Sequence, residues 1–364
     1  MRSTYWDSKS MMKRSIRSIL IVLIAGSLLS GLWIVRPILT DAADPAKPAI
    51  SAESIPYHSS RFDQVLAESR KFYRPGESRD FYAWMSDAYA HSKYRFPGKE
   101  KLAFEQLLRI KRADMAAIAD KNKRAEAEIA LGAWVHRLIK TVIPRFSLDR
   151  GFEFFNVMKY GERQCFLQSV LIAGLLQGMG VDAGAVMVYR NPVGQESNNG
   201  HAVVLVKLSN GRDIVVDASE QVPFARHQGL FVRASGYRYV EPVYARGSNK
   251  IISYRAGSQT IPDAKVRPLD FGFIRSQFWY YRGERAKDGL LAPRPTRQGL
   301  ASSASALETS VKLCPGNPLA VYMLGRTYRA LGKPRLAEYR FQQAAKLYAT
   351  YGWVPRDVKP YASR

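Results

Sequence analysis

An uncharged apolar segment near the N-terminus limits the architectures open to this 364-residue chain. Residues 18–35 carry no charged side chain over 18 positions. A helix of that length spans about 27 Å, close to the thickness of the hydrocarbon core of a bilayer. Five basic residues and one acidic residue precede the segment, and positive charge stays in the cytoplasm. The sequence therefore predicts a single-pass membrane anchor, with the N-terminus cytoplasmic and the bulk of the chain periplasmic or at the cell surface.

A cleaved signal peptide is the alternative explanation of this segment, with a cut near residues 40–42. The apolar run of a signal peptide normally has about 7–15 residues, and this longer run favours an uncleaved anchor. The chain has two cysteines, Cys165 and Cys314. In an oxidising compartment they form a disulfide with each other or leave at least one free thiol.

Composition shifts along the chain predict five parts. They are a basic cytoplasmic tail (1–17), the anchor (18–35), a linker rich in Pro, Ala and Ser (36–60), a main domain (61–270) and a helical C-terminal region (271–364). In the main domain, helical spacing over 124–142 and an apolar helical run over 165–179 give way to short strand patterns. This order predicts an α+β domain.

The C-terminal region contains a segment that matches the tetratricopeptide pattern, a helix pair of about 34 residues. The matching positions are Leu324, Gly325, Tyr328, Ala337, Phe341 and Ala344. Only Leu307 and Pro315 mark a degenerate unit upstream. Because a stable array usually needs about three or more units, we expect one good unit and one poor unit, packed on the main domain.

The chain is basic, with a net charge of +24. Because the chain is predicted to be exported, nucleic acid is a poor candidate for the partner that this positive charge would bind. Anionic lipid headgroups, an acidic cell-surface polymer or an acidic protein partner for the basic C-terminal region fit better. A generally basic, solvated surface explains the charge equally well. The sequence contains no phosphate-binding loop, zinc-ligand spacing or calcium loop, and therefore predicts no cofactor and no metal.

Three residues of the main domain have the types and positions of a nucleophilic triad. Cys165 begins an apolar helical run, and the partial positive charge of a helix N-terminus favours the nucleophilic thiolate. His201 begins an apolar strand, where an imidazole can take the thiol proton and pass it to a leaving group. Asp217 ends the next strand and can orient that imidazole. Taken singly, each has a plainer explanation, as a buried small side chain, a solvated histidine or a turn aspartate.

The turn between these two strands decides whether His201 and Asp217 share a face of the sheet. A two-residue loop puts them on opposite faces. A three-residue loop with Gly211 in the left-handed conformation puts them on one face, as diagonal neighbours about 7–8 Å apart at the backbone. The second register also sets Lys207 against Asp213, an opposite-charge pair, and is the one we favour.

Residues 125–220 resemble the transglutaminase-like superfamily of papain-like cysteine enzymes. The matching features are Trp134-Val135 in a helix, Cys165 at the start of an apolar helix, residues 180–183 leading into a strand, His201-Ala202 and Val216-Asp217. The three triad positions are separated by 36 and 16 residues, which suits that family. Two positions depart from its pattern, because Gly161 lies four residues before Cys165 and no aromatic residue follows His201 closely.

The resemblance implies an α+β papain/transglutaminase-like core, a helical lobe whose Cys-bearing helix packs on an antiparallel sheet. With the anchor in front and the tetratricopeptide-like hairpins behind, this is the predicted fold. In it, Cys165 would be the nucleophile, His201 the base and Asp217 the orienting carboxylate. The family attacks amides through an acyl-thioester, which an amine or water then resolves.

The predicted function is a membrane-anchored, extracytoplasmic thiol enzyme that acts on protein or peptide amide bonds, by hydrolysis or acyl transfer. Bulk water favours hydrolysis. The alternative is a non-catalytic assembly or scaffold protein, in which the papain-like domain and the tetratricopeptide-like tail bind partners.

Overall fold

The computed structural model describes residues 51–72 and 80–362, which belong to one compact unit. The predicted basic tail (1–17), the anchor (18–35) and most of the linker (36–60) lie outside the described residues. Within the described residues, no helix combines the length and the apolar character needed to cross a membrane.

The first part of the described chain is helical. Its elements are α1 (Ser60–Arg70), α2 (Phe81–Ala90), α3 (Phe104–Ala117), α4 (Lys121–Val142), β1 (Arg145–Phe146), α5 (Phe154–Tyr160), β2 (Glu162–Arg163) and α6 (Cys165–Gly178). The side chain of Asp120 caps α4 by accepting hydrogen bonds from the backbone N–H groups of Asn122 and Lys123. The helix ends shortly before Pro144, which cannot continue it. The helix predicted over 124–142 is therefore confirmed.

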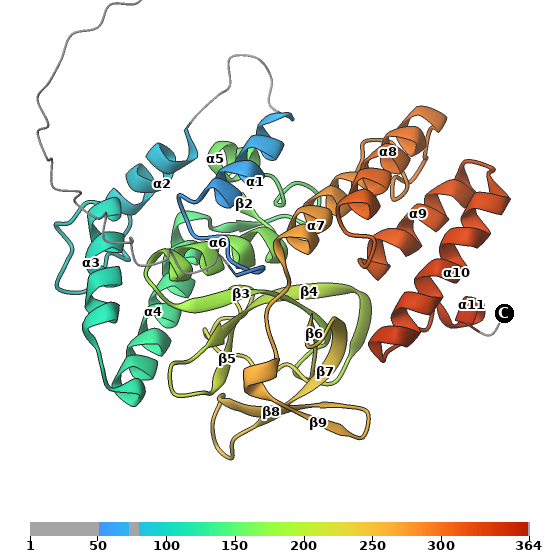
Figure 1. Ribbon diagram of the computed structural model, residues 1–364. Helices are drawn as coiled ribbons and strands as arrows, with labels where there is room; N and C mark the ends of the chain where they lie inside the picture. Colours follow the sequence, from blue (N-terminus) through green and yellow to red (C-terminus); the bar gives the residue numbers. More distant parts are fainter. Residues whose placement is uncertain (1–50, 73–79, 363–364) are drawn as a thin grey trace, which may run out of the picture. The chain divides into compact units, whose positions relative to one another are not determined.

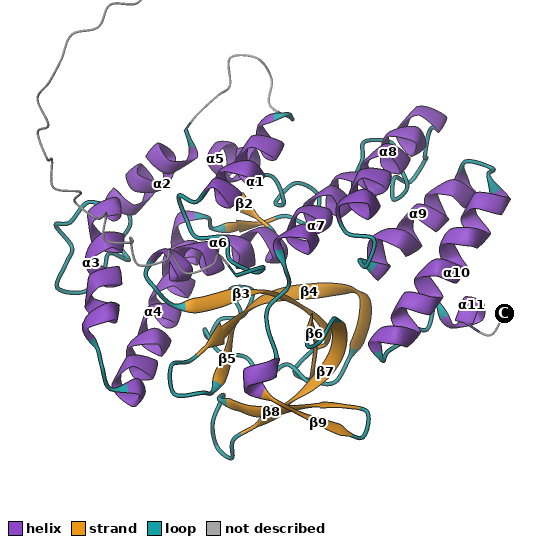
Figure 2. Cartoon of the chain, in the orientation of Figure 1, coloured by secondary structure: helices purple, strands orange, loops and turns teal. Residues whose placement is uncertain are grey.

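The strands after α6 form one antiparallel sheet that closes on itself. They are β3 (Asp182–Arg190), β4 (Glu196–Lys207), β5 (Asp213–Val216), β6 (Gly229–Arg233), β7 (Tyr237–Tyr244), β8 (Ile251–Ala256) and β9 (Gln259–Pro262). Their order is β5-β4-β3-β6-β7-β8-β9, and β5 also pairs with β8 through Asp213 and Ile251. The strands from β3 to β8 therefore make a barrel, which Figure 2 shows curling around a common interior.

Side chains along β3 and β4 alternate between the barrel interior and the helices outside. Val186 and Val203 belong to the interior cluster, whereas Met187 and Ala202 belong to the larger core around α6. Both faces of these strands are buried, which explains why they read in the sequence as continuous apolar runs rather than alternating ones.

Helix α6 lies against β3 and β4 (Figure 1) and also contacts α3 and α4. Every residue from Cys165 to Leu176 is buried. A helix surrounded on all sides needs an apolar surface all round, as this segment has. Its first residue, Cys165, is therefore held at a fixed position relative to the strands.

The predicted papain/transglutaminase-like α+β core is wrong, whereas the predicted transmembrane helix lies outside the described residues. The sheet closes into an antiparallel barrel, with helices α1–α11 around and after it. None of the helices in the described ranges could span a membrane. The sequence patterns over 229–268 indicate strands and loops, but a closure made by one residue pair, Asp213 with Ile251, leaves no local pattern to detect.

Residues after the barrel form α7 (Phe271–Glu284), α8 (Arg297–Leu313), α9 (Pro318–Ala330), α10 (Pro334–Tyr351) and α11 (Lys359–Ala362). Helix α7 packs on α8, and α9 packs on α10. Gly325 makes the second contact close, since a Cβ there would lie 2.8 Å from the ring of Phe341. Helix α10 also contacts β7, so this region is packed on the barrel.

Candidate active site

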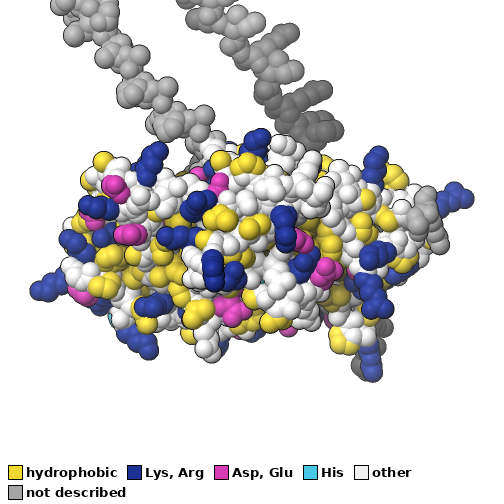
Figure 3. All heavy atoms as spheres, turned by 90° about the horizontal axis from the view of Figure 1, so that it is seen from below, with side chains coloured by type: hydrophobic (Ala, Val, Ile, Leu, Met, Phe, Trp, Pro, Cys, Tyr) yellow, Lys and Arg dark blue, Asp and Glu magenta, His cyan; other side chains and the backbone are white. Residues whose placement is uncertain are grey.

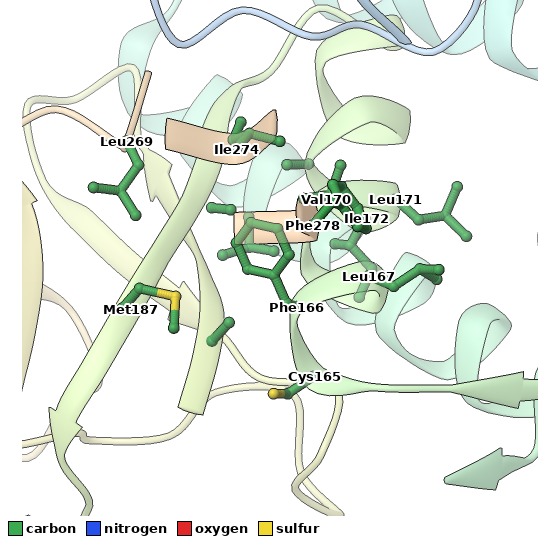
Figure 4. Close-up of a cluster of buried hydrophobic side chains, with 14 of the residues drawn as sticks. Cys165, Phe166, Leu167, Val170, Leu171, Ile172, Met187, Leu269, Ile274 and Phe278 are labelled. Carbon is green, nitrogen blue, oxygen red and sulfur yellow. The ribbon is translucent and has the colours of Figure 1, made fainter. Parts of the chain in front are cut away.

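Cys165 is the first residue of α6 and is only 6% exposed. Figure 4 places it at the edge of the apolar cluster that includes Phe166 and Val170. The first backbone N–H groups of a helix lack partners within the helix and carry partial positive charge, which favours a thiolate beside them. The Ser169 hydroxyl holds this end of the helix on β4, because it lies 2.8 Å from the Cys165 carbonyl oxygen and 3.0 Å from that of Ala202.

His201 and Asp217 meet in a hydrogen bond of 2.8 Å between Nε2 and Oδ2. Strands β4 and β5 pair Lys207 with Asp213, and Gly211 has a φ of +79°. The three-residue turn predicted from the sequence is therefore confirmed. This register is what brings the two side chains to the same face.

The thiol of Cys165 is near enough to His201 to help raise the pKa of its imidazole, and both residues line one cleft. The structure therefore brings together all three candidate residues, Cys165, His201 and Asp217, with the imidazole between the thiol and the carboxylate. They come from the start of α6, from β4 and from the end of β5.

Opposing influences set the pKa of His201. Burial is the largest and favours the neutral ring, but the hydrogen bonds to Asp217 and Cys165 outweigh it. Together they raise the pKa of His201 from 6.5 to about 10. His201 therefore holds its proton at neutral pH.

Asp217 is fully buried and accepts three hydrogen bonds. They come from Nε2 of His201 at 2.8 Å, Nε2 of His227 at 2.9 Å and the backbone N–H of Ser219 at 2.8 Å. Burial, the largest influence, would raise the pKa of Asp217, but the bonds and charges of the two histidines hold it well below its ordinary range. The carboxylate is therefore ionised and fixed in direction.

His227 is the site residue that the sequence analysis missed. It is buried and stands between β5 and β6, in a segment with no motif of its own. Only the return of the chain after β5 brings it to Asp217. The sequence feature that could have pointed to His227 is its position, between the candidate Asp217 and the apolar strand that begins at Gly229.

Helix α6 holds the loop that carries Asp217. The side-chain amide of Gln168 donates to the Ser219 hydroxyl at 2.7 Å and accepts from Nε of Arg163 at 2.7 Å. Gln168 is fully buried. The same loop is therefore tied to the first two turns of the helix that begins with Cys165.

Helix α4 holds the loop from a second direction. His136 Nε2 lies 3.1 Å from the carbonyl oxygen of Glu220, and Lys140 donates to the same oxygen. Burial, the largest influence, lowers the pKa of His136. This histidine therefore has a structural role, which is to hold the loop on α4.

A cleft of about 380 Å³ opens over Cys165 and His201. The other residues lining it are Phe146, Leu148, Val188, Tyr189, Asn191, Gln195 and Ser197. Phe146 and Leu148 are 51% and 50% exposed. Apolar side chains exposed beside a nucleophile form a suitable contact for an apolar group of a substrate.

His201, Asp217 and His227 also place three potential metal ligands within 4.8 Å of one another. A metal ion there would take the Nε2 atoms of both histidines and leave their Nδ1 atoms protonated. A metal-bound histidine usually donates that second N–H to an acceptor. Nδ1 of His227 is buried and has no partner among the described residues, so the donor set fits hydrogen bonding to Asp217 better than metal binding.

Cys165 and Cys314 are both free thiols. The disulfide alternative is therefore wrong. The sulfur of Cys314 lies 3.3 Å from the hydroxyl oxygen of Tyr237, away from the triad.

Neither a protein-family model nor a curated protein sequence matches the chain.

Proposed function

We propose that this chain is a thiol enzyme that acts on amide bonds of proteins or peptides. The observation that carries the proposal is the position of His201, which is hydrogen-bonded to Asp217 and lines one open cleft with Cys165. The resemblance of the residue order and spacing to transglutaminase-like enzymes supports the same reaction class.

In the proposed reaction, the Cys165 thiolate attacks the amide carbonyl carbon and forms a tetrahedral adduct. His201 gives its proton to the amide nitrogen, the C–N bond breaks, and the acyl group stays on sulfur as a thioester. Water or a second amine then attacks the thioester and gives a proton to His201. The thiolate leaves, and the product is a carboxylic acid or a new amide.

We further propose that the enzyme is anchored in a membrane and acts outside the cytoplasm. The support is the uncharged segment 18–35 and the basic residues before it. Fractionation of the full chain and of a chain lacking residues 1–35 tests this. Membrane association that does not depend on these residues would contradict it.

No single acidic partner follows from the overall basic charge. On the face shown in Figure 3, Lys and Arg side chains are spread out rather than gathered into one patch. This distribution supports a basic, solvated surface there. An acidic polymer or protein remains a proposal for the C-terminal region alone.

The test of the function is the rate at which iodoacetamide alkylates Cys165. The full chain carries Cys314→Ser, so that one thiol is observed, and the rate is measured against pH. We expect fast alkylation near neutral pH and a fall of at least tenfold in His201→Ala, because the imidazolium that stabilises the thiolate is gone. His91→Ala is the matched control, since His91 is exposed and lies on α2's C-terminal cap.

Intact-mass measurement after treatment with an activated ester adds the chemical step. We expect one acyl group on wild type and none on Cys165→Ala. An unreactive Cys165, or an alkylation rate that does not change in His201→Ala, would contradict the proposed enzyme activity. The scaffold function, in which the C-terminal helices bind a partner, would then be favoured.

A further inference from the structure

A second hollow, of about 460 Å³, lies beside the candidate active site. The residues that matter for its chemistry are Arg190, Arg226, Gln228, Glu241, Tyr244 and Arg255. Three arginines and one glutamate give it a net charge of +2. We call this hollow the arginine pocket.

Glu241 forms ion pairs with two of the three arginines. Its carboxylate accepts from Arg190 at 2.9 Å and from Arg255 at 3.1 Å. Arg226 is the third, and no carboxylate of residues 51–72 or 80–362 pairs with it. Its guanidinium lies 4.7 Å from the centre of the Tyr244 ring, an arrangement that holds the charge in place but leaves its N–H groups free for a ligand.

The arginine pocket and the residue that holds Asp217 from behind, His227, belong to the same segment of the chain. Arg226 directly precedes His227, whose ring contacts Asp217. The hydroxyl of Tyr244 donates to the carbonyl of His227 at 2.8 Å. A ligand bound by Arg226 would therefore lie next to the residues that hold the triad.

The turn between β3 and β4 separates this pocket from the cleft over Cys165. Arg190 and Pro192 line the arginine pocket, whereas Asn191 and Gln195 line the cleft. Adjacent residues of one short segment thus face the two hollows. A peptide bound in the cleft that continues past this segment would reach the arginines.

We propose that the arginine pocket binds a carboxylate of the acyl-donor peptide, so that the enzyme selects acidic peptides. This inference rests on the proposed function and assigns its substrate class. A guanidinium presents a planar fork of donors that matches a carboxylate with two parallel hydrogen bonds. The surplus positive charge of the pocket is the electrostatic complement of that group.

The experiment measures binding without turnover, in the full chain carrying Cys165→Ala. The probes are fluorescein-labelled hexapeptides of Ala and Gly with one Glu placed at each position in turn, each with a Gln twin. Fluorescence anisotropy gives Kd at low and high salt. We expect at least one Glu peptide to bind about tenfold more tightly than its Gln twin, with the difference shrinking in high salt.

Arg226→Gln should remove this preference, and Arg226→Lys should keep part of it, because a lysine retains the charge but not the fork. Arg246→Gln is the matched control, since it removes an equal charge from an exposed residue outside the pocket. Equal affinity for Glu and Gln peptides, or an equal loss in the Arg226 and Arg246 variants, would overturn the inference. Because Cys165→Ala cannot react, these results do not depend on the alkylation test of the proposed function, and either idea can fail alone.

Discussion

His201 and His227 contact the same carboxylate oxygen, Oδ2 of Asp217, at 2.8 and 2.9 Å. One histidine faces the cleft and the other is buried behind the carboxylate. Two donors converging on one oxygen leave the carboxylate little freedom to rotate. The direction of the His201 ring, and with it the contact to Cys165, therefore depends on a residue that never meets the substrate.

Replacement of His227 should make the position of the Asp217 carboxylate less fixed. In His227→Leu, Asp217 loses one of its hydrogen bonds, and we expect the alkylation rate of Cys165 to fall several-fold. The free energy of unfolding should fall by about 1–3 kcal/mol, since a buried acceptor loses a donor. Alkylation kinetics and urea unfolding measure the two effects. His227→Gln keeps an N–H donor and should recover part of the rate, and a wild-type rate in the leucine variant would contradict the positioning role.

The pH dependence of stability should report the raised pKa of His201. Its folded-state pKa is about 10, against 6.5 for the free side chain. A raised pKa means that the stabilisation is fully present below about pH 6.5 and is lost as the pH rises through 10. The stability difference between wild type and His201→Gln should therefore shrink between these two values. Urea unfolding at three pH values measures it, with the same series on His91→Gln as the comparison at an exposed histidine.

The buried amide of Gln168 should matter for both stability and reactivity. Gln168→Leu removes the links to Ser219 and Arg163, and leaves the buried guanidinium with one partner fewer. We expect a loss of about 1–3 kcal/mol in unfolding free energy and slower alkylation of Cys165, because the loop that carries Asp217 is released. Unaltered alkylation kinetics in a folded Gln168→Leu variant would show that the loop is held without this amide.

Gly184, the one glycine of β3, should not tolerate a larger residue. A Cβ there would lie 2.4 Å from Cβ and 2.7 Å from Cγ of Pro268. The proline ring cannot turn aside, so Gly184→Ala should lower the unfolding free energy by about 1–3 kcal/mol. Thermal unfolding measures the change. Gly178→Ala is the comparison, because its Cβ would meet only the Cβ of Tyr57 at an ordinary 3.6 Å, and equal losses in the two variants would refute the steric argument.

Local patterns in the sequence were sufficient for several parts of the site. The helix around Trp134, the apolar helix beginning at Cys165 and the turn at Gly211 each follow from a short stretch of residues. The opposite charges of Lys207 and Asp213 selected the register that joins His201 to Asp217. These predictions depend on neighbours along the chain, which a sequence displays directly.

The closed barrel and the second histidine were beyond such reasoning. The closure depends on Asp213 and Ile251 meeting after two intervening strands, β6 and β7, and no period or turn residue encodes that meeting. His227 reaches Asp217 only because the segment after β5 folds back. Both features are consequences of tertiary packing, which single-chain patterns do not record.

Closure of the sheet also bears on how the protein behaves at high concentration. An open sheet ends in strands whose free N–H and C=O groups can recruit a strand of another molecule, a route to aggregation. Here β5 pairs with β4 along its length and with β8 through Asp213, and β9 forms the outer edge of the described sheet. That strand has 4 residues and ends in Pro262, which has no N–H to offer. The barrel thus protects the chain from edge-to-edge assembly.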